Sequence, residues 1–175
     1  GEQISSSDAL HLDLIDYHVP SDQLSALQDE LCNTAQLTQH DIQQIISKYI
    51  TRPVESELSL LSDRIRQHFG FENIQEIEQS LANEQDENAQ AWASKILATL
   101  QQRSMVAKKT SLKMQHLGRS RSLQQCMQIE RDLQDIWFEY GDFIEGVRAL
   151  IVDKDKQPKW QVDNPALDKI LDELI

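Results

Sequence analysis

Apolar residues recur at every third or fourth position along most of the chain, which is the spacing of one face of an α-helix. In residues 89–103, for example, Trp92, Ile96 and Leu100 fall on one stripe and predict a buried helical face. Short polar, glycine or proline stretches separate the periodic segments. The pattern predicts an all-α bundle of about eight to ten helices, with at most one short strand, near residues 15–19.

Residues that can begin a helix stand directly before many of these segments. A Ser, Thr, Asp or Asn side chain there accepts a hydrogen bond from a free N–H of the first turn, and an acid three residues later can complete a capping box. The predicted caps are the Ser5-Ser6-Ser7-Asp8 run, Ser21, Thr38 with Asp41, Asn73 with Glu76, Ser122, and Asn164 before Pro165.

Other local features are also predicted from the pattern. The first helix is expected to include Leu12 and Leu14, and Gly70 is expected to end a later helix in a left-handed conformation. Residues 105–108 are expected to form an irregular entry to the segment that follows. The last helix is expected to present Leu167, Ile170, Leu171 and Leu174 on its apolar face.

Residues 141–160, called the signature segment below, combine a helix start, an apolar face and a charged exit. Asp142 and Glu145 have the spacing of a capping box, so a helix is predicted to start at Phe143. Gly146 lies inside this helix, where glycine costs about 1 kcal/mol relative to alanine, so a neighbour is expected to pack closely against it. Pro158 prevents the helix from continuing. The predicted buried face consists of Phe143, Val147, Leu150 and Ile151, with Arg148 on the charged side, and Trp160 is expected to pack back over Phe143 and Trp137.

The chain is strongly acidic, with a formal net charge of −12 and a pI near 4.7. Nucleic acids and anionic membranes attract positively charged surfaces, so neither is expected as a partner. Basic residues cluster between Lys95 and Arg131, either as a solvated helical face or as contacts to the phosphate of a nucleotide-like ligand. No stretch has the length and apolarity of a membrane span or the pattern of a secretory leader.

Motifs for catalysis or metal binding are not found. Cys32 and Cys126 stand far apart without a second pair, so neither a disulfide framework nor a zinc site is indicated, and a reducing compartment fits best. The five histidines lack the spacings of metal-binding motifs, so no metal ligand is predicted. Paired acids such as Asp132 and Asp135 lie on predicted solvent faces. No catalytic residue is therefore predicted within this chain.

The signature segment resembles the C-terminal signature of the enoyl-CoA hydratase/isomerase (crotonase) superfamily, and most closely its 3-hydroxyisobutyryl-CoA hydrolase branch. That branch reads D-F-x-E-G-V-R-A-x-L-I-D-K-D-x-x-P-K-W, and this chain matches it from Asp142 to Trp160, with Ile-Val in place of Leu-Ile. The opening ISSSDALHLDLIDYHVPSDQL is similar to the stretch that follows the catalytic helix in this family, although Asp13 replaces a usual glycine. TSLK at residues 110–113 also matches the branch, with Lys109 in place of a proline.

The resemblance implies the C-terminal part of a crotonase-fold enzyme, with residues 1–37 as the tail end of the crotonase core and residues 38–175 as a C-terminal helical domain. In the family, the loops that form the oxyanion hole precede the opening segment and are rich in glycine and alanine, so no catalytic residue is carried over to this chain. The lysine of the family's terminal phrase approaches CoA, and Lys154 is its match. A surface lysine between Asp153 and Asp155 is the alternative.

The function that the resemblance implies for the parent is hydrolysis of 3-hydroxyisobutyryl-CoA, or of a related acyl-CoA, in valine catabolism. No cofactor is expected, because the CoA thioester is the substrate. This chain alone is expected to be inactive and to serve packing and oligomerisation, with the upstream crotonase core and further copies as partners. The expected location is the cytoplasm in a bacterium or the mitochondrial matrix in a eukaryote. The alternative function is a non-catalytic, crotonase-like scaffold for protein interaction.

Overall fold

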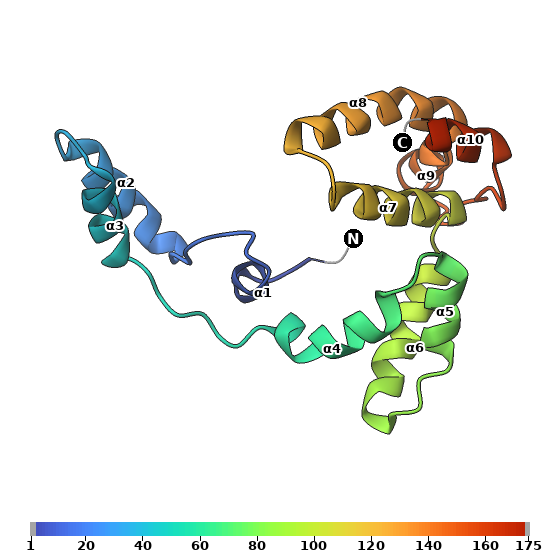
Figure 1. The fold of residues 1–175 in the computed structure, drawn as a ribbon, viewed down its shortest axis with the longest axis horizontal. Coiled ribbons are helices and arrows are strands. Elements are labelled where there is room, and N and C mark those ends of the chain that lie inside the picture. Colours follow the sequence, from blue (N-terminus) through green and yellow to red (C-terminus); the bar gives the residue numbers. More distant parts are fainter. Residues whose placement is uncertain (1–2, 174–175) are drawn as a thin grey trace. The chain divides into compact units, whose positions relative to one another are not determined.

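The chain folds as an all-α protein, as predicted. The computed structural model describes residues 3–173, and within that range it contains ten α-helices, one 3₁₀-helix, one π-helix and no strand (Figure 1). The α-helices are α1 (Ser6–His11), α2 (Leu24–Asn33), α3 (Gln39–Ser47), α4 (Glu57–Phe69), α5 (Ile74–Ala82), α6 (Glu87–Gln101), α7 (Met105–Gly118), α8 (Leu123–Tyr140), α9 (Phe143–Val147) and α10 (Pro165–Glu173). The 3₁₀-helix is η1 (Ser21–Gln23) and the π-helix is η2 (Arg148–Val152). Across these described residues, no helix is both long and apolar enough to pass through a lipid bilayer.

Residues 15–19, where at most one short strand is expected, form no strand in the described chain. A strand needs a neighbouring strand to donate and accept its backbone hydrogen bonds. Here the backbone is instead joined to a distant segment by the Thr51 N–H, which donates to the His18 carbonyl at 3.1 Å. His18 Nδ1 and the Thr51 hydroxyl add a second contact at 2.9 Å. The segment is therefore a tethered connection between helices.

The chain divides into two compact units, Gly1–Gln67 and His68–Ile175. In the first unit α2 lies beside α3 (Figure 1), and Ile45 is buried. Asp8 on α1 accepts hydrogen bonds from the Ser56 hydroxyl at 2.7 Å and the Leu58 N–H at 3.0 Å, which ties α1 to the start of α4. These bonds, that from Ser56 foremost, hold the pKa of Asp8 well below its usual range. The predicted domains, residues 1–37 as the tail end of a crotonase core and residues 38–175 as a helical domain, are defined by residues upstream of this chain. That division stays a prediction.

The second unit contains two apolar clusters. The first lies between α5 and α6, where Ile77 and Leu81 are buried and the predicted stripe of Trp92, Ile96 and Leu100 packs against them. Burial of such faces, more than intrinsic propensity, stabilises helices of this length. The second cluster joins α7, α8 and α10 and consists of Val106, Leu167 and Leu171, with Leu133, Ile136 and Trp137 packed against them.

Most of the predicted helix starts are confirmed. Ser5, Thr38 and Ser122 each accept a hydrogen bond from the first turn of their helix in a complete capping box. The Asn73 and Asn164 side chains also accept a backbone N–H of their helices, at 2.9 and 3.0 Å. These starts depend on contacts within four residues, which explains why the sequence pattern identifies them.

Two local predictions for the first unit are wrong. Ser21 does not cap a helix with its side chain, because it lies inside η1 and α2 begins only after that turn. The first helix ends at His11 and does not include Leu12 and Leu14, because Asp13 adopts a left-handed conformation with a φ of 54°.

Two further predictions are wrong in the second unit. Gly70 is not left-handed, since no described glycine has a positive φ, and the chain passes into α5 through an extended Asn73 with φ −137° and ψ 156°. Residues 105–108 are regular helix, because the Ser104 hydroxyl caps α7 by accepting the Ala107 N–H at 3.0 Å. Leu174, assigned to the face of the last helix, lies outside the described residues.

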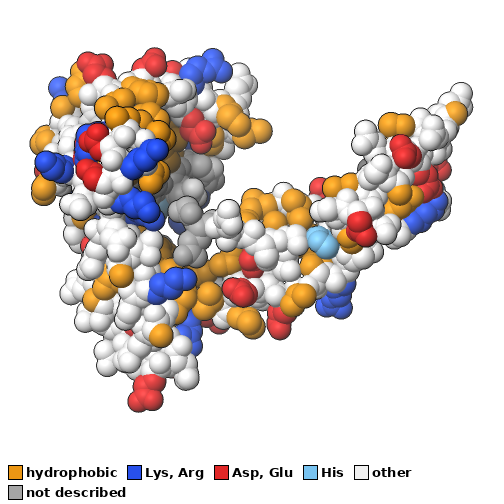
Figure 2. All heavy atoms as spheres, turned by 180° about the vertical axis from the view of Figure 1, so that it is seen from behind, with side chains coloured by type: hydrophobic (Ala, Val, Ile, Leu, Met, Phe, Trp, Pro, Cys, Tyr) orange, Lys and Arg blue, Asp and Glu red, His pale blue; other side chains and the backbone are white. Residues whose placement is uncertain are grey.

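Large apolar side chains also remain at the surface. In Figure 2 they are visible among acidic and basic side chains on the face that is drawn. In the second unit several of them follow one another within the signature segment. The exposed apolar residues of that segment are Phe143, Ile144, Leu150, Ile151 and Val152.

Truncation of Ile77 tests the cluster between α5 and α6. Because Ile77 is 2 % exposed, Ile77→Ala is expected to lower the free energy of unfolding by about 2–5 kcal/mol, through lost contacts and the cavity that remains. A urea titration followed by circular dichroism measures the change. The control is Leu123→Ala on α8, since Leu123 is 75 % exposed and its truncation should matter by less than about 0.5 kcal/mol. Equal midpoints for the two variants would contradict the assigned core.

Candidate functional site

The signature segment begins with a close turn between α8 and α9. Gly141 ends α8, as predicted, and a Cβ at this position would lie 2.7 Å from the Trp137 carbonyl oxygen and 2.9 Å from the Trp137 ring. Real side chains do not approach so closely, so any other residue would force the turn apart. The φ of Gly141 is −89°, which means that close approach rather than a left-handed backbone requires glycine here.

The predicted capping box of Asp142 and Glu145 is wrong. Asp142 does precede α9, but its backbone, with φ −87° and ψ 12°, is not the extended conformation that directs a cap side chain to the first turn. The residue is buried, and its carboxylate accepts hydrogen bonds from the Ser104 hydroxyl at 2.5 Å and the Gln161 N–H at 3.1 Å. Asp142 therefore joins the starts of α7 and α9 to the chain that leaves the signature segment.

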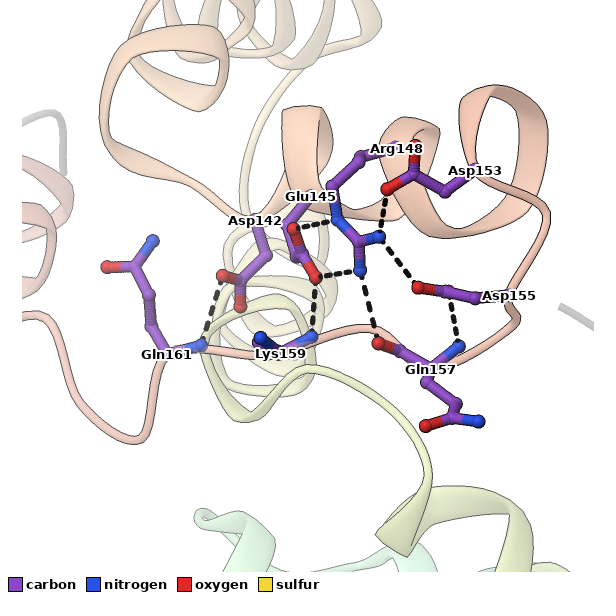
Figure 3. A network of polar contacts seen from close by, with 8 residues as sticks. All are labelled: Asp142, Glu145, Arg148, Asp153, Asp155, Gln157, Lys159 and Gln161. Carbon is purple, nitrogen blue, oxygen red and sulfur yellow. Dashed lines mark hydrogen bonds and ion pairs between the residues drawn. The ribbon is translucent and has the colours of Figure 1, made fainter.

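Arg148 is the centre of a polar network, as Figure 3 shows. Its Nε and Nη2 donate to the two Glu145 oxygens, both at 2.8 Å, and its Nη1 donates to Asp153 at 2.5 Å and Asp155 at 2.8 Å. Nη2 also donates to the Gln157 carbonyl at 3.2 Å. A guanidinium has five N–H donors, so these five bonds account for all of them. Arg148 lies among the charges, as predicted. Residues 153–160, called the exit loop below, are folded around it.

The network lowers the pKa values of Glu145 and Asp155. The Arg148 hydrogen bonds, followed by the Lys159 N–H at 2.6 Å, lower the pKa of Glu145 from 4.5 to about 2. Arg148, followed by the Gln157 N–H, likewise holds the pKa of Asp155 below its usual value, and the acids raise the pKa of Arg148 above its own. A general acid or base needs a pKa near the working pH, so these acids are suited to holding structure rather than to proton transfer at neutral pH.

The exit loop presents two lysines on unusual backbone. Lys154 and Lys156 have φ values of 55° and 56°, the left-handed region that side chains other than glycine seldom adopt. Both are exposed, and within residues 3–173 neither ammonium group has a hydrogen bond or ion pair, whereas the flanking Asp153 and Asp155 are bound to Arg148. Lys154 is the residue predicted to contact CoA, and that role stays a prediction.

The predicted single helix and its buried face are wrong. The helix starts at Phe143, as predicted, but after Val147 the backbone widens into η2, where the Asp153 N–H donates to the Arg148 carbonyl at 2.8 Å. A π-helix pairs residues five apart instead of four, which rotates later side chains away from the α-helical face. Leu150 is 64 % exposed. Phe143 is also exposed, and its ring contacts the Phe138 ring edge-on with 4.6 Å between the ring centroids. Ala149 is the buried apolar residue of this segment.

Trp160 packs against Gly146, which confirms the close neighbour predicted there. A Cβ on Gly146 would lie 3.4 Å from the tip of the Trp160 ring, which is ordinary van der Waals contact, so the ring is the neighbour of Gly146 and leaves room for a Cβ there. The indole N–H donates to the Gln102 carbonyl at the end of α6, at 2.9 Å, and the ring is half-buried. Phe143 and Trp137 line the same hollow as Trp160, and the packing of Trp160 over these two rings stays a prediction.

That hollow has a volume of about 620 Å³ and lies among the ends of α6 and α8, the start of α7 and the signature segment. Most of its wall is apolar. Arg103 and Lys156 are the cationic residues among its lining, and Asp142 is the acidic one. The apolar side chains that form it include Trp137, Phe143, Leu150, Ile151 and Trp160.

Several residues of this site are not evident from the sequence. Gln102 and Ser104 are 58 and 38 residues from the side chains that bind them, and no local pattern marks them or Arg103. TSLK at residues 110–113 lies on α7, where Thr110 is buried and Lys113 pairs with Asp172. Among the described residues, no group of three or more His, Cys, Asp or Glu is arranged to hold a metal ion.

The sequence was compared with known protein families. Residues 1–174 match the enoyl-CoA hydratase/isomerase family, which is nearly the whole chain. The chain belongs to this family. The family resemblance of the signature segment is thereby confirmed. In this member of the family, the network around Arg148 holds that segment in shape.

Curated relatives include proteins named 3-hydroxyisobutyryl-CoA hydrolase. The chain is 30 % identical over 166 residues to 3-hydroxyisobutyryl-CoA hydrolase 1 of Arabidopsis thaliana, which is 92 % of this chain and 44 % of the relative. It is 30 % identical over 173 residues to the mitochondrial 3-hydroxyisobutyryl-CoA hydrolase of Dictyostelium discoideum, covering 97 % and 44 %. The small ribosomal subunit protein mS47 of Arabidopsis thaliana is 32 % identical over 114 residues, covering 63 % and 27 %. The chain therefore spans less than half the length of these relatives.

Trp160→Ala tests whether the indole anchors the signature segment. We expect a loss of about 2–3 kcal/mol in the free energy of unfolding, below the ~3–5 kcal/mol of a fully buried tryptophan because Trp160 is only half-buried. A denaturant titration measures it. Lys154→Ala in the same loop is the control and should stay within about 0.5 kcal/mol of wild type. If the tryptophan variant unfolds at the wild-type midpoint, Trp160 is not an anchor.

Glu145→Gln tests the network through its pH dependence. The folded pKa of Glu145, about 2, lies below its usual 4.5, so ionised Glu145 stabilises the fold above pH 4.5, and this contribution is lost as the pH falls toward about 2. Glu145→Gln removes the titrating group, so its urea midpoint should fall less steeply than that of wild type as the pH is lowered through this window. Glu57→Gln controls for the loss of one negative charge. Parallel midpoint curves for wild type and Glu145→Gln would refute the assignment.

Proposed function

We propose that this chain is the C-terminal helical part of an acyl-CoA thioester hydrolase that acts on 3-hydroxyisobutyryl-CoA in valine catabolism. The observation that carries the proposal is the match of 92 % and 97 % of the chain to two hydrolases of that name. The chain aligns with 44 % of each relative, so the remaining part of the parent is proposed to supply the catalytic loops. No catalytic residue and no cofactor are assigned to this chain, since the CoA thioester enters as the substrate.

The role proposed for this part is packing and oligomerisation. Ile144 and Val152, exposed apolar residues of the signature segment that do not line the hollow, support it, because large apolar side chains at a surface commonly mark a contact area. The partners are proposed to be the upstream crotonase core of the same parent and further copies of the chain. The network around Arg148 would hold the segment in one shape for such contacts.

Lys154 is proposed to contact CoA. Its ammonium group is exposed and lacks an acidic partner within the described residues, because Asp153 and Asp155 bind Arg148. A lysine in this state can pair with a phosphate oxygen. Substitution of Lys154 by glutamine in the parent should therefore raise KM for the acyl-CoA by about two- to fivefold with kcat unchanged. An unchanged KM would make Lys154 an ordinary surface lysine.

Thioester hydrolysis tests the main proposal. The 175-residue chain should not release thiol from 3-hydroxyisobutyryl-CoA, because loss of one oxyanion donor alone costs about a hundred- to a thousandfold and the whole apparatus is assigned to the parent. The parent should release it readily. A chromogenic thiol reagent follows the reaction, and turnover by this chain well above the blank would overturn the division of roles.

A second candidate is a non-catalytic scaffold for protein interaction. The likeness to small ribosomal subunit protein mS47 favours it, because the name of that relative places it in a large assembly. A scaffold parent would lack thioester hydrolysis and would sediment with an assembly much larger than itself. Hydrolysis by a parent that sediments alone decides for the enzyme.

The proposed location is the mitochondrial matrix in a eukaryote or the cytoplasm in a bacterium. The mitochondrial location is supported by the relative from Dictyostelium discoideum, whose name describes it as mitochondrial. Imaging of a tagged parent in its own cells tests this proposal.

A further inference from the structure

We propose that the hollow beside Trp160 binds a small amphipathic anion, whose apolar body fills the hollow and whose acidic head group pairs with Arg103 and Lys156. This inference goes beyond the proposed function, because it assigns a ligand class to residues of this chain alone. It depends neither on thioester hydrolysis nor on a scaffold role.

The hollow has the size and wall of a small-molecule site. Its volume of about 620 Å³ falls inside the range of about 300–1,000 Å³ that is typical of ligand pockets, and its wall is mainly apolar. Trp160 is held in place by the hydrogen bond to Gln102 and by contact with Gly146. The wall on this side is therefore formed before a ligand arrives, which reduces the cost of ordering on binding.

The charges around the hollow favour an anion. On α7, the neighbouring cations Lys108, Lys109 and Lys113 are all paired with acids. The side chains of Arg103 and Lys156, by contrast, have no hydrogen bond or ion pair among residues 3–173, although the chain carries a net charge of −12.

The acid in the lining forms no ion pair with either of them. Both oxygens of Asp142 are occupied, by the Ser104 hydroxyl and by the Gln161 N–H, and the residue is buried. The acids of the exit loop are bound to Arg148. Two cationic side chains without an ion-pair partner therefore stand beside an apolar wall, which is complementary to an apolar ligand with an acidic head group.

The backbone of Lys156 is also fixed in position. Its N–H donates to the Ala149 carbonyl at 3.0 Å, and its left-handed φ of 56° is maintained by a loop that Arg148 holds closed. A non-glycine residue in this conformation is strained, and such strain is common where a side chain must be presented to a ligand. A protein segment over the hollow would bury Arg103 and Lys156 and would need acids at matching points, since unpaired buried charges are costly.

Dodecanoate and its neutral analogue dodecan-1-ol test the proposal in the 175-residue chain, after circular dichroism has confirmed the helical fold. Trp137 and Trp160 line the hollow, so their fluorescence should change as it fills, while Trp92 on α6 lies outside the lining. Dodecanoate should bind more tightly than dodecan-1-ol. Arg103→Gln and Lys156→Gln should each weaken dodecanoate by about two- to fivefold and leave dodecan-1-ol unchanged, as expected for one partly exposed ion pair.

Lys169→Gln is the matched control, because it removes the same charge from an exposed lysine on α10 that does not line the hollow. It should leave both ligands unaffected. Equal binding of dodecanoate and dodecan-1-ol, or an equal loss in Lys169→Gln and Lys156→Gln, would overturn the proposal. Self-association of the chain that Ile151→Gln abolishes would overturn it too, since a second copy would then cover the hollow. The thioester assay is separate, so failure of the hydrolase proposal leaves these results interpretable.

Discussion

The guanidinium of Arg148 is the interaction on which the signature segment depends. It is bound by three carboxylates and one carbonyl, all from residues between Glu145 and Gln157. Three negative charges in so short a stretch would repel one another without a central cation. A lysine has no planar fork of five donors and could not satisfy the same set. The exit loop therefore takes its shape from one side chain rather than from a regular secondary structure.

The second constraint on this segment comes from far along the chain. Asp142 is held by Ser104, and the Trp160 indole is held by Gln102, so both ends of the segment are tied to the junction of α6 and α7. Gly141 allows the backbone to approach the Trp137 ring. The polar residues of the signature segment thus serve mainly to fold it. Among the described residues, the exposed ammonium groups of Lys154 and Lys156 have no acidic partner.

The surface of the second unit carries both apolar side chains and cations that are open to contacts. A segment with a rigid backbone carries exposed apolar side chains on α9 and η2, next to an apolar hollow with cations in its lining. Family membership rests on nearly the entire chain, while the hydrolase relatives are more than twice as long as their aligned regions. A structural role for most of the signature and a ligand role for a few of its exposed cations are therefore compatible.

The all-α class, most helix starts and the apolar stripe of α6 follow from the sequence alone, because they depend on residues within about four positions of one another. The family can also be inferred from the sequence, because the resemblance rests on the contiguous residues 142–160. The tertiary structure alone decided that Asp142 binds Ser104 instead of capping α9, because a buried partner 38 residues away competes with the local N–H group. It also decided that the helix widens at Arg148 and exposes Leu150, since the ion pairs of the exit loop outweigh the periodicity that predicts a buried α-helical face.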